Sequence, residues 1–442
     1  MPEVGAGSQM VVVFFVLLLL RVPVAFALGL SALYAMWVLG FGLDLVGDLI
    51  ATGIAKFSLL AIPFFILAGE LMGSGGLAER MIRFFRVLIG GLPGGMGVVG
   101  TVVCLFWGAV SGSGPASVAA IGPLIVRSME EDGYSRMFAA GLVCTGAALS
   151  IVIPPSIGLI IYGVVAETSI SDLFIAAIIP GLFVGALMLL TLPFGGGNTR
   201  GVTGTPGLDR LAALSVDAEQ PYGRRLVRAF LDSFWGLIMP VVILGGIYSG
   251  VFTPTEAAIV ATVYALVIGA FIYRNLTPRV LYESFVRASS SSAVVMLVVA
   301  YASLFGWVVT VDDLVGQYSS VLLGLSQNEW VILLVIMLVL LLAGMFMDAV
   351  TIMFITLPIF LPVVRELGWD PVWFGVLVMI NLAIGLITPP VGINLFVAAN
   401  VTRLPLEKVT RGVVPFLITS MVGLAVIACF PEIAHLLIGA MR

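Results

Sequence analysis

The sequence is poor in charge. Only 10% of its 442 residues are Asp, Glu, Lys or Arg, whereas 61% are hydrophobic and the mean hydropathy is +1.19. Soluble domains carry roughly 25% charged and about 45 to 50% apolar residues. The net charge of −4 also gives no basic surface for a nucleic-acid partner. The composition therefore predicts an all-α polytopic protein whose partner is the lipid bilayer.

Residues that commonly carry catalysis are scarce as well. His435 is the single histidine, and Lys56 and Lys408 are the only lysines. The phosphate-binding pattern G-x-x-x-x-G-K-[ST] is absent. The three cysteines lie in apolar runs without metal-ligand spacing. The sequence thus predicts that the protein is not an enzyme and does not hydrolyse ATP, so that an ion gradient or a partner must supply energy.

Apolar segments long enough to cross about 30 Å of hydrocarbon recur along the chain. They are 9–20 running on through 24–40, 57–73, 95–127, 134–166, 170–192, 229–250, 255–273, 284–310, 328–364, 371–402 and 412–430. We predict about eleven or twelve passes from these segments. Because Glu3 is the only charged residue before Arg21, the first segment lacks the basic start of a signal peptide. It is predicted to be a retained helix with its N-terminus outside the cytoplasm.

Helix-breaking residues repeat at a fixed distance. Pro154-Pro155 interrupts an apolar run, and Pro389-Pro390 does the same 235 residues later. The same offset pairs Pro123 with Pro358, Gly133 with Gly368, and Pro180 with Pro415. The chain is therefore predicted to contain two structural repeats, 1–192 and 224–442, joined by a glycine-rich cytoplasmic linker at 193–223.

Basic residues suggest that the two repeats are inverted. If the N-terminus is outside, all Lys and Arg except Lys56, Arg365 and Arg442 fall on or near the inner face, as cytoplasmic loops prefer. This arrangement requires segments 95–127 and 328–364 to be re-entrant hairpins that enter and leave on one side. Basic residues flank the first hairpin and mainly acidic residues flank the second, which indicates that they open to opposite sides. The broken helices are then 134–166 and 371–402.

The breaks predict a transport site. Irregular backbone at membrane depth persists where it is buried in protein or lines a cavity, and in inverted repeats it binds substrate and sodium ions. A structural kink or a close helix crossing is the alternative reading of any single break. We predict two sodium sites related by pseudo-symmetry, with the substrate nearby. The candidate residues are Ser111, Gly112, Ser113, Gly114, Pro154, Pro155, Ser156, Gly344, Met347, Asp348, Thr351, Thr388, Pro389, Gly392 and Asn394.

Asp348 is the strongest single candidate, because an ionisable residue inside a membrane segment is a functional hypothesis by default. Glu70 and Glu256 lie nearer helix ends, where capping is an equally good explanation. No Lys or Arg lies deep in a predicted span. An anionic substrate is therefore expected to be held by helix N-termini, hydroxyls and bound sodium.

Four stretches are long and specific: SGSGPASVAAIG at 111–122, IPPS at 153–156, GVFTPTEAA at 250–258, and 344–362. They resemble one family, the large membrane subunit of tripartite ATP-independent periplasmic (TRAP) transporters. The likeness runs from about residue 20 to 425. The resemblance implies a sodium-coupled secondary transporter in the bacterial inner membrane that imports an organic acid such as a C4-dicarboxylate or sialic acid.

The resemblance also implies partners and a mechanism. A periplasmic substrate-binding protein delivers the organic acid, and a small membrane subunit of about four helices pairs with this one. Such transporters are thought to work as elevators. By that resemblance 95–166 and 328–402 form the moving transport domain, the arms at 77–90 and 311–325 connect it, and the remainder is scaffold.

Three alternatives stay open on the sequence. A stand-alone sodium-coupled carboxylate carrier would share the fold but need no binding protein. A channel would need a continuous polar pore. A membrane enzyme would need a catalytic constellation, which the residues do not offer.

Overall fold

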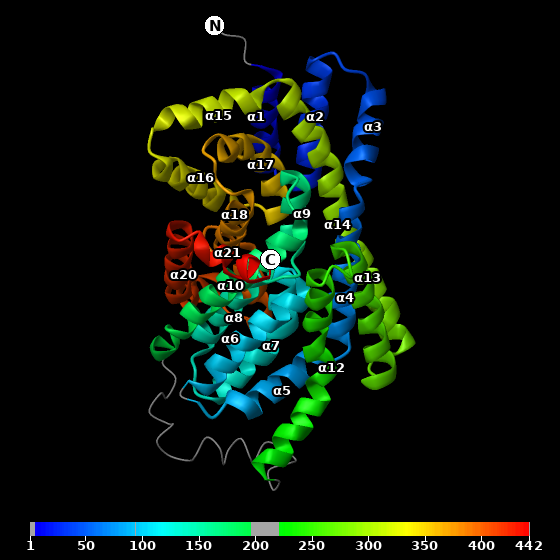
Figure 1. The fold of residues 1–442 in the computed structure, drawn as a ribbon, viewed down its shortest axis with the longest axis vertical. Coiled ribbons are helices and arrows are strands. Elements are labelled where there is room, and N and C mark those ends of the chain that lie inside the picture. The colour runs from blue at the N-terminus through cyan, green and yellow to red at the C-terminus, as the bar shows by residue number, and fades with distance from the viewer. Residues whose placement is uncertain (1–4, 93, 196–220, 442) are drawn as a thin grey trace.

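The computed structural model describes residues 5–92, 94–195 and 221–441. Every regular element within these ranges is helical, and the helices form an elongated body (Figure 1). Most of the predicted linker at 193–223 lies outside the described residues.

The first part of the chain contains ten α-helices. They are α1 (Ala6–Leu19), α2 (Val24–Val38), α3 (Leu43–Ile54), α4 (Ala61–Ser74), α5 (Leu77–Ile89), α6 (Gly95–Ser111), α7 (Gly114–Glu131), α8 (Arg136–Ala148), α9 (Ile157–Ala166) and α10 (Ile170–Leu189). Short 3₁₀ turns, η1 (Phe57–Leu60) and η2 (Leu149–Ile151), precede α4 and follow α8.

The second part, after residue 221, contains ten described α-helices. They are α12 (Tyr222–Tyr248), α13 (Pro254–Val267), α14 (Pro278–Val311), α15 (Leu314–Leu325), α16 (Glu329–Gly344), α17 (Ala349–Glu366), α18 (Pro371–Gly385), α19 (Ile393–Thr402), α20 (Leu406–Cys429) and α21 (Glu432–Met441).

Within the described chain, seven helices are long and apolar enough to cross a membrane. The apolar segments 95–127, 134–166 and 371–402 do not form single long helices, because each is interrupted and divides into two shorter ones. The run at 9–40 likewise divides into α1 and α2, with Arg21 in the left-handed conformation between them. Helices α3 and α21 were not predicted from the sequence. Length alone thus undercounts the apolar elements of this fold.

Helix bounds repeat in the register of the prolines. Helix α17 begins and ends 235 residues after α7. Helices α15, α16, α18, α19 and α20 begin within two residues of the positions that the same offset gives for α5, α6, α8, α9 and α10. The main departure is α14, a single 34-residue helix, where the first part of the chain has α3, η1 and α4.

Packing between the two parts is reciprocal. Helix α7 packs against α19, and its counterpart α17 packs against α9. In the same way α8 packs against α20 and α18 against α10, while α4 packs against α13 and α14 against α2. The α6–α7 and α16–α17 hairpins lie toward opposite ends of the long axis (Figure 1). Small residues allow the closest crossing, because a Cβ on Gly141 would lie only 2.1 Å from the Gly412 carbonyl oxygen.

Candidate functional site

The first hairpin turns within two residues. Gly112 ends α6 in the left-handed conformation, with φ of 61°, and Ser113 precedes α7 in an extended conformation. This backbone suits glycine because a side chain there is strained. A Cβ on Gly112 would also lie 3.3 Å from the Pro155 carbonyl oxygen. The tip of the hairpin therefore packs directly on the first helix break.

That break is closed off from solvent. Helix α8 tightens into the 3₁₀ turn η2, the chain passes through Pro154 and Pro155, and α9 begins after Ser156. The Ser156 hydroxyl caps α9 by accepting from the Leu159 backbone N–H at 3.4 Å, and it donates to the Ile151 carbonyl. The residues from Ser150 to Ile160 are all buried. The predicted break is thus present, surrounded by protein.

The second hairpin turns at Asp348. Both of its carboxylate oxygens are engaged with Thr351, one accepting from the backbone N–H at 3.0 Å and the other from the hydroxyl at 2.6 Å. Asp348 is therefore the N-cap of α17, which is a structural task that aspartate performs well. Gly344 ends α16 beside Gly385, whose Cα is 3.1 Å from a Cβ built on Gly344, and Met347 is buried.

The second break is joined to that hairpin by backbone. The Gly392 N–H donates to the Met345 carbonyl oxygen at 2.9 Å, and the Thr388 hydroxyl donates to the Ile384 carbonyl at 2.6 Å. Gly392 has a positive φ of 54°. Pro389 is exposed, unlike the prolines of the first break. In each part of the chain, therefore, a hairpin tip and a helix break lie together.

Asn394 links the two parts. Its side-chain N–H donates to the Cys144 carbonyl oxygen at 3.1 Å, although the two residues are 250 positions apart. Its Oδ1 is buried and has no hydrogen-bond partner in the described chain. A Cβ on Gly114, at the start of α7, would lie 3.1 Å from this oxygen. A buried amide oxygen without a partner calls for an explanation, and such oxygens are ligands for hard cations.

A metal held mainly by charged or soft ligands does not fit this arrangement. In the described residues no three His, Cys, Asp or Glu side chains group as a metal site would require. The oxygens at the tips and breaks come instead from hydroxyls, an amide, backbone carbonyls and the carboxylate of Asp348. This donor set is unlike the thiolate and imidazole sites that hold transition metals.

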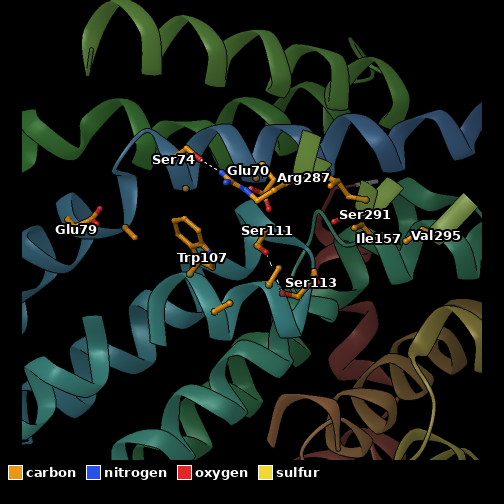
Figure 2. A pocket seen from close by; sticks show the side chains of 17 residues that line it. Glu70, Ser74, Glu79, Trp107, Ser111, Ser113, Ile157, Arg287, Ser291 and Val295 are labelled. Carbon is orange, nitrogen blue, oxygen red and sulfur yellow. Dashed lines mark hydrogen bonds and ion pairs between the residues drawn. The ribbon is translucent and has the colours of Figure 1, made fainter. Parts of the chain in front are cut away.

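A cavity of about 480 Å³ borders the first hairpin tip. Ser111 and Ser113 line it, and the other predicted site residues do not. Its opposite wall comes from α4 and α14, where Arg287 and Glu70 meet (Figure 2). The Arg287 Nε lies 3.0 Å from Glu70 Oε2.

Sequence reasoning missed this ion pair. Taken singly, Glu70 is a residue near a helix end and Arg287 is a charge at the inner face. The available signal is a pair of opposite charges, each within an apolar helix and therefore unusual for a membrane segment. Nothing in the sequence indicates that the two helices are neighbours, so the charges cannot be paired from it.

Comparison with known proteins identifies the family. Residues 11–433 match the family model described as the tripartite ATP-independent periplasmic transporter, DctM component. The chain is 39% identical to the C4-dicarboxylate TRAP transporter large permease protein DctM of Pseudomonas aeruginosa, covering 86% of this chain and 85% of that one. It is 36% identical to the sialic acid TRAP transporter large permease protein SiaM of Vibrio cholerae, with 95% and 96% covered.

Another relative is a longer chain. The isethionate TRAP transporter permease protein DctMQ of Oleidesulfovibrio alaskensis is 39% identical over 95% of this chain, which spans only 64% of that protein. These relatives are named as transporter permeases, not enzymes.

A solved structure supports the fold. The YdaH transporter of Alcanivorax borkumensis superposes with a TM-score of 0.62 at 16% sequence identity, covering 95% of this chain and 97% of that one. At such low identity, the superposition shows a shared fold and says nothing about a shared function. With a family model spanning nearly all of the described residues and relatives matched along most of their length, the chain belongs to the DctM component family, the large permeases of tripartite ATP-independent periplasmic transporters.

Proposed function

We propose that this protein imports an organic acid across the bacterial inner membrane, driven by sodium ions, after a periplasmic binding protein delivers the acid. A small membrane subunit completes the transporter. The observation that carries the proposal is the pairing of a hairpin tip with a helix break in each part of the chain, where hydroxyl, amide and carbonyl oxygens gather. Relatives named for C4-dicarboxylate, sialic acid and isethionate transport support an organic acid as the substrate class.

The two parts are proposed to be inverted repeats. The common register of their helices and the reciprocal packing of α7 on α19 and α17 on α9 support this proposal. With the N-terminus in the periplasm, the linker at 193–223 is cytoplasmic. Helices α6–α9 and α16–α19 then form a transport domain that moves as an elevator against a scaffold containing α4 and α14, and the cavity lies at the boundary between the two.

Two sodium ions are proposed to bind where tips and breaks meet. Asn394 Oδ1 is a ligand of one of them, because it is buried beside the first tip without a partner. Oxygens around Asp348 and Thr388 are proposed for the other, by correspondence between the repeats. Asp348 is the observed N-cap of α17, and its negative charge would also favour a bound cation.

Transport in liposomes tests the proposal. The chain is reconstituted with its small subunit, and uptake of labelled succinate, sialic acid and isethionate is followed with and without a sodium gradient and the cognate binding protein. Uptake that requires both supports the proposal. Sodium-driven uptake that needs no binding protein would instead identify a stand-alone carrier, and uptake that does not saturate would indicate a channel.

Asp348→Asn separates ion binding from helix capping. Asparagine caps a helix about as well as aspartate but carries no charge. A sodium ligand at this position therefore predicts a higher sodium requirement with an unchanged melting temperature. If uptake by Asp348→Asn shows the wild-type sodium dependence, Asp348 is a cap only. Ser233→Ala is a control for general damage, because this buried hydroxyl bonds within α12 to the Ala229 carbonyl, away from the site.

A further inference from the structure

Arg287 on α14 lines the cavity and forms hydrogen bonds along one edge of its guanidinium. Its Nε donates to Glu70 Oε2 at 3.0 Å and its Nη2 donates to the Ser74 hydroxyl at 3.0 Å. A longer bond of 3.4 Å joins Nη2 to Ser284, which also donates to Ser74 at 2.9 Å. One edge of the Arg287 guanidinium is therefore fixed between α4 and α14.

The other end of the guanidinium, Nη1, can still donate hydrogen bonds. Arginine carries five N–H donors and no acceptor, and within the described chain no hydrogen bond leaves Nη1. Half of the Arg287 side chain is exposed, against 29% for Glu70. Arg287 lines the cavity, as do Ser291 one turn further along α14 and Ser111 at the hairpin tip (Figure 2).

An ion pair this exposed contributes little to stability, so joining two helices is a poor explanation for it. Two acidic residues line the cavity. Glu70 accepts a hydrogen bond from Nε of Arg287 and not from Nη1, and Glu79 lies on α5 at the far end of the cavity (Figure 2). Arg287 thus borders a cavity whose largely apolar lining also includes Ser111, Ser113 and Ser291.

We propose that Arg287 is a specificity-determining residue that binds the carboxylate of the transported acid through Nη1, while Glu70 holds the guanidinium in place. The carboxylate lies between Arg287 on the scaffold and the Ser111 and Ser113 hydroxyls on the hairpin. Guanidinium and carboxylate form strong charge-assisted hydrogen bonds of defined geometry. This inference rests on the proposed function, because it names the group that recognises the acid during passage between scaffold and transport domain.

Arg287→Gln tests the proposal in the reconstituted transporter. The KM for succinate is expected to rise about tenfold or more, the usual consequence of losing a hydrogen bond to a charged group. The preference for succinate over its monoamide, succinamate, is expected to shrink, and Arg287→Lys should restore part of it. Arg279→Gln is the matched control, because Arg279 lies on the same helix, is 89% exposed and, among the described residues, forms its ion pair with Glu283 of its own helix.

A purely structural arginine predicts a different result. Its loss would lower the maximal rate and the melting temperature but leave the preference for succinate over succinamate unchanged. The double variant Glu70→Gln/Arg287→Gln leaves no unpaired charge and serves if the single variant folds poorly. Equal KM and equal preference for the Arg287 and Arg279 variants would overturn the proposal.

A binding measurement separates this inference from the proposed function. Succinate and sialic acid are titrated into the detergent-solubilised complex while its melting temperature is followed, since a ligand that binds the folded state stabilises it. The half-stabilising concentration is expected to rise about tenfold or more in Arg287→Gln. Acids that stabilise the wild type but are not transported would refute the proposed function alone. Acids that do not stabilise the wild type would refute the role of Arg287.

Discussion

Asn394→Leu removes one buried oxygen from the junction of the two parts. In the wild-type chain Oδ1 has no hydrogen-bond partner, and an unsatisfied buried polar group costs about 1–3 kcal/mol. A sodium ion bound there would remove that cost. Raising sodium from zero to 100 times its Kd is expected to stabilise the wild type by about 2.7 kcal/mol for each site that it fills. Leucine has a similar size without the oxygen, so the variant should lose the stabilisation of one site and keep that of the other. Thermal unfolding in detergent, with choline replacing sodium, measures both.

Asn381→Leu is the matched control. Asn381 is also buried, donates its Nδ2 to a backbone carbonyl, that of Met337, at 2.7 Å, and has an Oδ1 without a partner in the described chain. It lies in α18 and bonds to α16, whereas Asn394 bonds to Cys144 of α8 beside the first tip. Its replacement should therefore leave the contribution of the Asn394 site to the sodium response intact. If both variants keep the wild-type response, or both lose it, Asn394 is not a specific sodium ligand.

Three further substitutions test close packing at two glycines and one helix cap. Each has its own comparison variant, and melting temperature is the readout. Gly385→Ala would place a Cβ 2.7 Å from the backbone of α16, so we expect a loss of about 1–3 kcal/mol, whereas Gly306→Ala meets nothing within 4 Å and should be neutral or slightly stabilising. Gly112→Ala should cost more than Gly250→Ala, because both have positive φ but only Gly112 is also crowded. Thr253→Ala removes the capping box of α13 and should cost about 0.5–2 kcal/mol, while Thr253→Ser should retain most of it.

Local chemistry made the interruptions predictable. Proline lacks a backbone N–H donor and disfavours helical conformation in the residue before it. Pro154 and Pro389 therefore predict the two breaks without knowledge of their surroundings. Gly112 and Asp348 likewise lie where the hairpins were expected to turn. The offset of 235 residues that relates these prolines and glycines recurs in the helix bounds of the structure.

Contacts between distant segments were not predictable in the same way. Glu70 and Arg287 are separated by 217 residues, and only the packing of α4 on α14 brings them together. The contact between Asn394 and Gly114 likewise depends on α19 packing against α7. Asp348 was predicted as a ligand on its charge, but sequence could not reveal that both of its oxygens bond to Thr351, because side-chain direction is set by the turn.

The reciprocal packing has a consequence for biosynthesis. The first helix break contacts α18 through η2, and α7 packs against α19, both of which are translated much later. Freed backbone groups need partners within the bilayer. While the ribosome is still making the later helices, water, lipid headgroups or another subunit must satisfy the first break. The interior therefore closes only once the last of these helices has been inserted, and a chain that stalls at the linker would be a target for membrane quality control.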